Sequence, residues 1–173
     1  LLTGAEVLAT QDDAGREIRD GAVFVDGGWI AAVGSCAEVE AWMAQGPATR
    51  TPDRRHDLRG CVLTPGLVNG HHHLYQTLTR AVPGGQDALL FGWLQTLYPI
   101  WARFGPEEMF TSAQIGLAEL ALSGCTMSSD HLYLYPNGAR LDDTIAAARE
   151  VGLRFHPTRG AMSIGESDGG LPP

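Results

Sequence analysis

Short apolar stretches separated by turn residues fill the first third of the chain, a pattern that predicts a small β-sheet. In residues 22–34, two apolar stretches flank Gly27 and Gly28. Because glycine readily adopts the positive φ angles of tight turns, this segment predicts a β-hairpin. Residues 1–10 supply a further candidate strand that pairs with the hairpin, and the polar residues 11–20 are expected to connect the two.

A short helix and a loop are expected to follow the hairpin. Residues 37–45 predict a surface helix, and residues 46–55, which contain Pro47 and Pro52, predict a loop. We therefore assign residues 1–64 to the N-terminal part of a small β-rich domain.

The apolar run at residues 61–68 opens a different pattern, in which candidate strands alternate with candidate helices. Residues 87–97 carry leucines at helical spacing, and the pattern continues to Trp101 beyond a kink expected at Pro99. Residues 106–123 form the clearest helix, because a proline opens it, two glutamates complement its positive N-terminal end and one face is apolar.

A strand over residues 125–132, a helix over 141–151 and a strand over 153–158 continue the alternation. This order predicts a parallel sheet, either open and doubly wound or closed as a (β/α)₈ barrel. No GxGxxG or GxxxxGK[ST] motif follows a candidate strand, which removes the usual nucleotide-binding version of the open sheet.

The net charge of −8 at pH 7 limits the partners of the protein. With 12 basic against 20 acidic residues and no basic cluster, the chain would repel nucleic-acid phosphates and anionic membrane surfaces. No apolar run approaches the ~18 residues that a membrane-spanning helix needs, so we expect a soluble protein that binds neither nucleic acid nor membrane. Three widely spaced cysteines without a CxxC pair, and no leader-like N-terminal segment, favour a cytoplasmic location.

The candidate chemistry is concentrated in three consecutive histidines that follow an apolar stretch. On a strand, residues i and i+2 point to the same side, so His71 and His73 can converge on one ion while His72 faces away. Two neutral imidazoles make half of a tetrahedral zinc shell. The alternative is a polar surface loop; an affinity tag is excluded by the internal position of the run. For His72 we expect a packing or hydrogen-bonding role.

Residues 65–73, with the sequence PGLVNGHHH, resemble the first-strand signature of the amidohydrolase superfamily. Its members are zinc- or iron-dependent (β/α)₈ hydrolases with a small β-domain. The hairpin ending in residues 30–34 resembles part of that β-domain. Within the superfamily, residues 71–83, 90–94 and 129–138 are similar to the 8-oxoguanine deaminases, a subgroup that includes hydroxydechloroatrazine ethylaminohydrolase. The likeness covers essentially the whole chain.

The resemblance implies an α/β fold, namely the N-terminal portion of a (β/α)₈ TIM barrel preceded by the small β-rich domain. A complete barrel takes roughly 250 residues, so residues 65–173 supply about three of its strands. The family's remaining metal-binding histidine, a second histidine, a proton-shuttling glutamate and a water-activating aspartate are expected on later strands, so no catalytic residue is assigned here. Residues 165–173 resemble a loop after the third strand, and this portion alone is expected to be inactive.

The resemblance also implies roles for five residues. His71 and His73 would bind one divalent metal ion, Zn²⁺ or alternatively Fe²⁺. Gln76 would offer its amide, both a donor and an acceptor, to a purine ring; the alternative is a solvated loop glutamine. Trp93 would line the pocket or serve as a buried structural tryptophan. His131, at the predicted end of the second barrel strand, would touch the substrate or cap its loop.

The implied activity is metal-assisted hydrolytic deamination of a purine-like free base, in first place 8-oxoguanine to urate and ammonia. A triazine aminohydrolase or chlorohydrolase would use the same metal site. A non-catalytic scaffold related to amidohydrolases is the alternative of another class, and the retention of both His71 and His73 argues against it. The HxE and PCxxC motifs of cytidine deaminases and the HExxH helix of metalloproteases are absent. The expected partners are a small heterocyclic base and further copies of the chain in a homo-oligomer.

Overall fold

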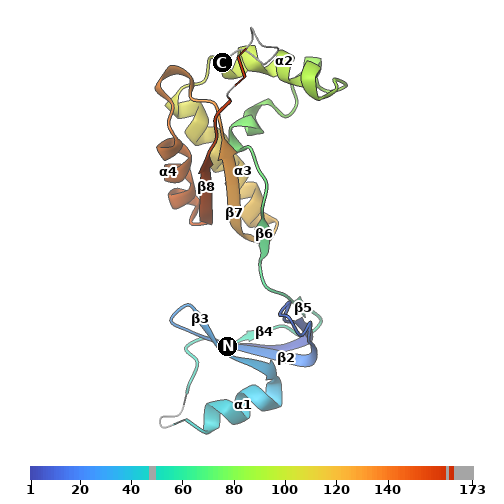
Figure 1. Ribbon diagram of the computed structural model, residues 1–173. Helices are drawn as coiled ribbons and strands as arrows, with labels where there is room; N and C mark the ends of the chain where they lie inside the picture. Colours follow the sequence, from blue (N-terminus) through green and yellow to red (C-terminus); the bar gives the residue numbers. More distant parts are fainter. Residues whose placement is uncertain (47–49, 163, 166–173) are drawn as a thin grey trace. The chain divides into compact units, whose positions relative to one another are not determined.

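The computed structural model describes residues 1–46, 50–162, 164 and 165. The chain divides into two compact units, Leu1–Pro65 and Gly66–Pro173 (Figure 1). Part of the predicted loop at residues 46–55 and most of the predicted loop at residues 165–173 lie outside the described residues. No helix in the described part of the chain is long and apolar enough to cross a membrane.

The first unit is built on a β-sheet. Its strands are β1 (Leu2–Ala9), β2 (Glu17–Asp26), β3 (Trp29–Ser35), β4 (His56–Asp57) and β5 (Val62–Leu63). β1, β2 and β3 pair antiparallel in the order β3-β2-β1, whereas β4 and β5 pair parallel with β1. The predicted hairpin is confirmed: Gly27 and Gly28 occupy the turn between β2 and β3, with φ angles of 55° and 84°.

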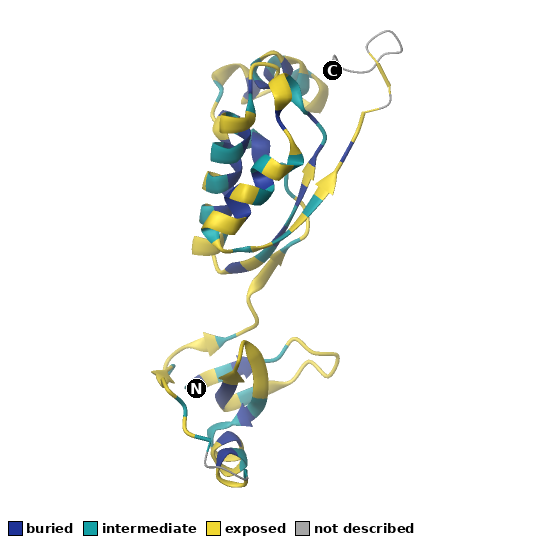
Figure 2. Ribbon diagram, turned by 90° about the vertical axis from the view of Figure 1, so that its left-hand side faces the viewer, coloured by how far each residue is buried: buried dark blue, intermediate teal, exposed yellow. Residues whose placement is uncertain are grey.

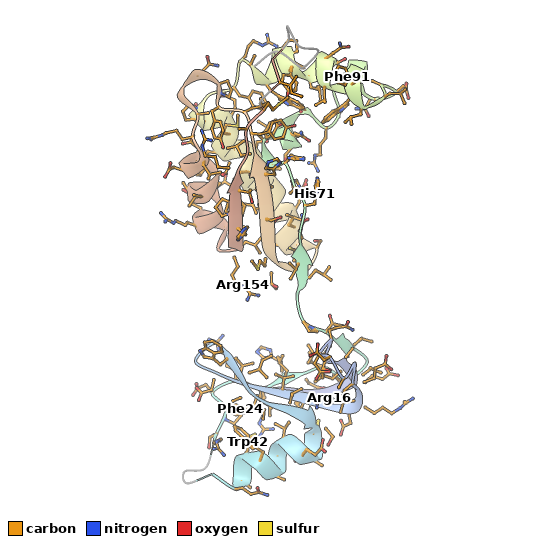
Figure 3. The ribbon with its side chains drawn as sticks, viewed as in Figure 1. Arg16, Phe24, Trp42, His71, Phe91 and Arg154 are labelled. Atoms are coloured by element: carbon orange, nitrogen blue, oxygen red, sulfur yellow. The ribbon has the colours of Figure 1, made fainter. Side chains whose placement is uncertain are left out.

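The helix predicted after the hairpin is confirmed as α1 (Cys36–Ala44). Ser35 and Glu38 form a capping box, in which each side chain accepts a hydrogen bond from the other residue's backbone N–H. One face of α1 packs on the sheet, and the rings of Phe24 and Trp42 lie 5.6 Å apart between centroids (Figure 3). The buried members of this cluster are Ala22, Phe24, Val39 and Met43.

One prediction about the first unit is wrong. β2 begins at Glu17, so residues 17–20 belong to the strand and not to the connection, because backbone pairing with β1 outweighs their polar character.

The apolar run at residues 61–68 contains two strands. Its first part, β5, pairs with β1, whereas β6 (Leu67–Asn69) belongs to the sheet of the second unit.

The second unit is a parallel sheet covered by helices on one face. β6, β7 (Cys125–Leu132) and β8 (Arg154–Arg159) pair in the order β6-β7-β8. α3 (Pro106–Leu122) precedes β7 and α4 (Leu141–Val151) precedes β8, and the two helices lie side by side on the sheet (Figure 1). This order confirms the predicted alternation of strands and helices. The described residues contribute three parallel strands, which do not close a barrel.

The buried residues of the second unit, dark blue on the ribbon of Figure 2, lie on both its helices and its strands. One cluster joins the helices to η1 (Leu74–Thr79), the 3₁₀ helix that directly follows the histidines. It comprises Leu74, Ala113, Leu117, Ala147 and Ala148. A Cβ at Gly116 would lie 2.8 Å from side-chain atoms of Leu74 and of Thr77, so glycine allows η1 to pack closely on α3.

The helix predicted from residue 87 begins three residues later than expected and reaches Trp101 as the pattern indicated. α2 runs from Leu90 to Trp101 and continues through Pro99. Leu90, which the leucine spacing placed on the apolar face, is 73% exposed. The buried side chains lie in the second half of the helix and are Leu97, Tyr98 and Trp101. Their packing holds this half helical in spite of the backbone hydrogen bond that Pro99 cannot donate.

Candidate metal centre

The three histidines follow β6 and do not lie within a strand, contrary to the prediction. β6 ends at Asn69, whose Oδ1 accepts a hydrogen bond from the backbone N–H of His71 at 3.1 Å. This contact shapes the chain as it leaves the strand. Figure 3 labels His71 beyond the carboxyl end of β6. Loops at that edge of a parallel sheet are where α/β proteins assemble their sites.

The rings of His71 and His73 lie next to each other. Their centroids are 5.1 Å apart and their planes are nearly perpendicular, at 88°. Nδ1 of His73 lies 2.8 Å from the carbonyl oxygen of His131. Because a carbonyl oxygen only accepts, the proton is on Nδ1, and Nε2 of His73 keeps the lone pair that a metal ion requires.

Aromatic rings surround His73. Its ring centroid lies 5.4 Å from that of Tyr133, 5.6 Å from that of His131 and 6.5 Å from that of Tyr75. Tyr75 is fully buried and lies 5.0 Å from Trp101 between ring centroids. The aromatic core of the second unit therefore extends to the histidines and restricts the ring of His73.

A buried carboxyl group contacts the residue that follows the three histidines. Asp130 of β7 is 1% exposed, and its Oδ1 accepts a hydrogen bond from the backbone N–H of Leu74 at 2.8 Å. Its Oδ2 is buried with no hydrogen-bond partner among the described residues. Burial raises the pKa of Asp130 to about 6, although the hydrogen bond from the Leu74 N–H and the proximity of His73 act in the opposite direction.

His72 differs from its two neighbours. Its carbonyl oxygen accepts a hydrogen bond from the backbone N–H of His131 at 2.9 Å. Its Nδ1 is buried with no partner within the described ranges. Burial, together with the proximity of His73 and of the Arg80 charge, lowers the pKa of His72.

Gln76 lies beside the histidines, on η1. A shallow depression is lined by His71, His72, His73, Gln76, Thr77 and Arg80. Nε2 of Gln76 donates to the hydroxyl oxygen of Tyr75 at 3.1 Å. The guanidinium of Arg80 donates to both carboxylate oxygens of Glu119, at 2.7 Å and 2.8 Å, so its charge is already paired.

The structure places Trp93 and His131 differently. Trp93 is half-buried, with its ring 5.4 Å from that of Trp101, and it does not line the depression. This placement favours the structural alternative for Trp93. His131 has an exposed side chain. Its backbone forms hydrogen bonds to residues 71–74, which we call the histidine segment.

His71 and His73 fit a metal ion as two of its ligands. Neutral imidazole nitrogens are preferred zinc ligands, and the hydrogen bond to the His131 carbonyl is the kind of support that metal-binding histidines receive. In the residues that the structure describes, no group of three or more His, Cys, Asp or Glu side chains is arranged to hold an ion. These two histidines are the candidate ligands of this chain.

The sequence interpretation missed two residues that shape the site, Asp130 and Tyr133. Asp130 lies within the strand predicted over residues 125–132, and a carboxyl group at such a position was a usable signal. Tyr133 follows β7 directly, and its contact with His73 depends on the pairing of β6 with β7.

The model of the Amidohydrolase family matches residues 62–169. The chain belongs to this family. The resemblance inferred from the PGLVNGHHH segment is thereby confirmed. As an amidohydrolase, the chain carries its paired histidines at the carboxyl end of the first strand of its parallel sheet.

Three similar proteins show the range of the family. An 8-oxoguanine deaminase of Pseudomonas aeruginosa is 45% identical over 161 residues, which are 92% of this chain and 34% of the relative. A hydroxydechloroatrazine ethylaminohydrolase of Pseudomonas sp. (strain ADP) is 31% identical over 100% of this chain and 37% of its own length. The structure of atrazine chlorohydrolase from Arthrobacter aurescens TC1, complexed with zinc, matches with a TM-score of 0.83 and 32% identity, over 98% of this chain and 37% of that one. The chain thus spans about a third of the length of these proteins.

Proposed function

We propose that the protein containing this chain is a metal-dependent hydrolytic deaminase of a purine-like free base, with 8-oxoguanine as its preferred substrate. In this reaction 8-oxoguanine and water give urate and ammonia. The observation that carries the proposal is the pair His71 and His73 in an amidohydrolase that is 45% identical to an 8-oxoguanine deaminase. The parallel strands and their helices would form the first part of a (β/α)₈ barrel.

His71 and His73 would hold one divalent ion, for which we propose Zn²⁺, with Fe²⁺ as the alternative. Such an ion, when bound, activates water for nucleophilic attack at neutral pH. The zinc in the similar chlorohydrolase structure supports this assignment. The contribution of this chain is to fix the ring of His73: the His131 carbonyl holds the proton of His73 on Nδ1, and the surrounding aromatic rings restrict its orientation.

Gln76 would recognise the heterocycle. It lines the same depression as the two histidines, and its amide can both donate to and accept from a purine edge. Arg80, the cation of the depression, has its charge paired with Glu119. This favours an uncharged free base over a nucleotide.

The substrate proposal is tested by measuring ammonia release from the intact protein. The panel contains 8-oxoguanine, guanine, isocytosine and an aminotriazine, and chloride release is measured with a chlorotriazine. We expect kcat/KM for 8-oxoguanine to exceed that for every other compound by at least about tenfold, a difference of about 1.4 kcal/mol in transition-state binding. A chlorotriazine or aminotriazine that is turned over as efficiently would instead support the triazine hydrolase reading. A metal-loaded protein that converts none of these compounds would support the scaffold reading.

Gln76→Ala is expected to lower kcat/KM for the preferred base by about tenfold or more, because a polar ring edge left unpaired in a binding site loses ~1–3 kcal/mol. Metal content should be unchanged. Gln114→Ala is a suitable control, since Gln114 on α3 donates a hydrogen bond to Glu150 of α4 and does not line the depression. A Gln76→Ala enzyme within twofold of the wild type would show that Gln76 does not touch the ring.

A further inference from the structure

Two consecutive residues of β7 form three hydrogen bonds with the histidine segment. Oδ1 of Asp130 accepts from the Leu74 N–H at 2.8 Å. The carbonyl oxygen of His131 accepts from Nδ1 of His73 at 2.8 Å, and the His131 N–H donates to the carbonyl oxygen of His72 at 2.9 Å. The histidine segment is thus attached to the strand at three successive residues.

Asp130 is the one side chain of β7 in this set, because His131 contributes only backbone atoms. Its carboxyl group is 1% exposed and one of its oxygens has no partner among the described residues, an arrangement that destabilises a fold. Packing alone would be served better by an apolar side chain. The position of the carboxyl group beside a candidate metal ligand indicates another role.

We propose that Asp130 is a positioning residue for the metal centre: by holding the Leu74 N–H, it fixes the His73 backbone so that Nδ1 meets the His131 carbonyl and Nε2 is left to bind the metal ion. The peptide plane that joins His73 to Leu74 is rigid, so a bond to the Leu74 N–H sets the orientation of the preceding residue. Ser112 of α3 reinforces this, because its hydroxyl donates to the Leu74 carbonyl oxygen at 2.7 Å. The inference rests on the proposed function of His71 and His73 as metal ligands.

The test measures the zinc affinity of the intact protein by competition with a chromophoric chelator, alongside its urea unfolding midpoint. Asp130→Ala removes the acceptor and is expected to weaken zinc binding ~10–100-fold, the usual effect of removing a group that orients a ligand. Asp130→Asn keeps an oxygen that can accept from Leu74 and should retain affinity within about threefold. Thr144→Ala is the matched control, since Thr144 is fully buried on α4 and its hydroxyl donates to the Leu141 carbonyl oxygen of its own helix.

The outcomes separate this inference from the proposed function. If the wild-type protein binds no divalent metal, both the proposed function and the role of Asp130 are refuted. If the wild type binds zinc and Asp130→Ala binds it equally tightly, only the positioning role of Asp130 is lost. An equal loss of affinity in Asp130→Asn, or in Thr144→Ala, also overturns it, because the effect would then come from charge or from general destabilisation. If Asp130→Ala does not fold, Asp130→Ser replaces it in the test. If neither of these variants folds and Asp130→Asn also loses zinc, then Asp130 serves folding alone and the proposal fails.

Discussion

His73→Ala is expected to remove the bound metal from the intact protein and to lower kcat by about 10³-fold or more. A metal ion contributes several kcal/mol of transition-state stabilisation, and each 1.36 kcal/mol changes the rate about tenfold. His73 is the candidate ligand whose tautomer is fixed by another residue and whose ring is packed among Tyr75, His131 and Tyr133. The measurements are elemental analysis of the purified variant and its rate of ammonia release.

His71→Ala should behave in the same way, because its ring is the neighbour of His73 at 5.1 Å between centroids. His72→Ala is the control within the same segment. It removes a buried nitrogen that has no partner among the described residues, and the backbone bond to His131 remains. His72→Ala should therefore keep its metal. The same metal content in all three variants would contradict the assignment of the ligands.

The pairing of the two histidines could be expected from a short segment, whereas the contacts that support them could not. The spacing of His71 and His73 predicted that their side chains would lie together, and their rings are neighbours although they follow the strand and do not lie within it. The tautomer of His73, however, depends on the His131 carbonyl, which is 58 residues away along the chain. Similarly, the sequence shows a carboxyl group at Asp130 but not the Leu74 N–H that it holds. Such contacts form only when β6 pairs with β7 and η1 packs on α3.

The fold, too, could be predicted where local sequence patterns decide it, and not where contacts between distant residues decide it. β7, α4 and α3 were predicted to within about one residue, because their apolar periodicity and their terminal residues agree. The start of α2 was expected three residues too early, because the side chains at the beginning of the helix are exposed and the packing around Trp101 holds its second half. The sequence shows one apolar run at residues 61–68, and nothing in it indicates that its two halves pair with different sheets.

Trp101→Ala is expected to destabilise the second unit by ~3–5 kcal/mol, the usual effect of removing a large aromatic side chain from a core. Trp101 is fully buried, and its ring centroid lies 5.0 Å from that of Tyr75, 5.4 Å from that of Trp93 and 5.6 Å from that of Tyr98. A loss of this size is a large fraction of the 5–15 kcal/mol that typically separates folded from unfolded protein. Urea unfolding of the intact protein, followed by circular dichroism, measures it.

Trp101 also reaches η1 through hydrogen bonds, so the same substitution should affect the site. Its Nε1–H donates to Oγ1 of Thr79 at 2.9 Å, and the Thr79 hydroxyl donates to the Gln76 carbonyl oxygen at 2.9 Å. Trp101→Phe keeps most of the packing but loses the hydrogen bond to Thr79. It should lower the free energy of unfolding by about 1–2 kcal/mol. It should also raise KM for the base more than it lowers kcat. Trp29→Ala is the control, since Trp29 is 80% exposed and its removal should change stability by less than about 0.5 kcal/mol. If Trp101→Ala is no more destabilising than Trp29→Ala, the aromatic cluster does not support the loop that carries the histidines and Gln76.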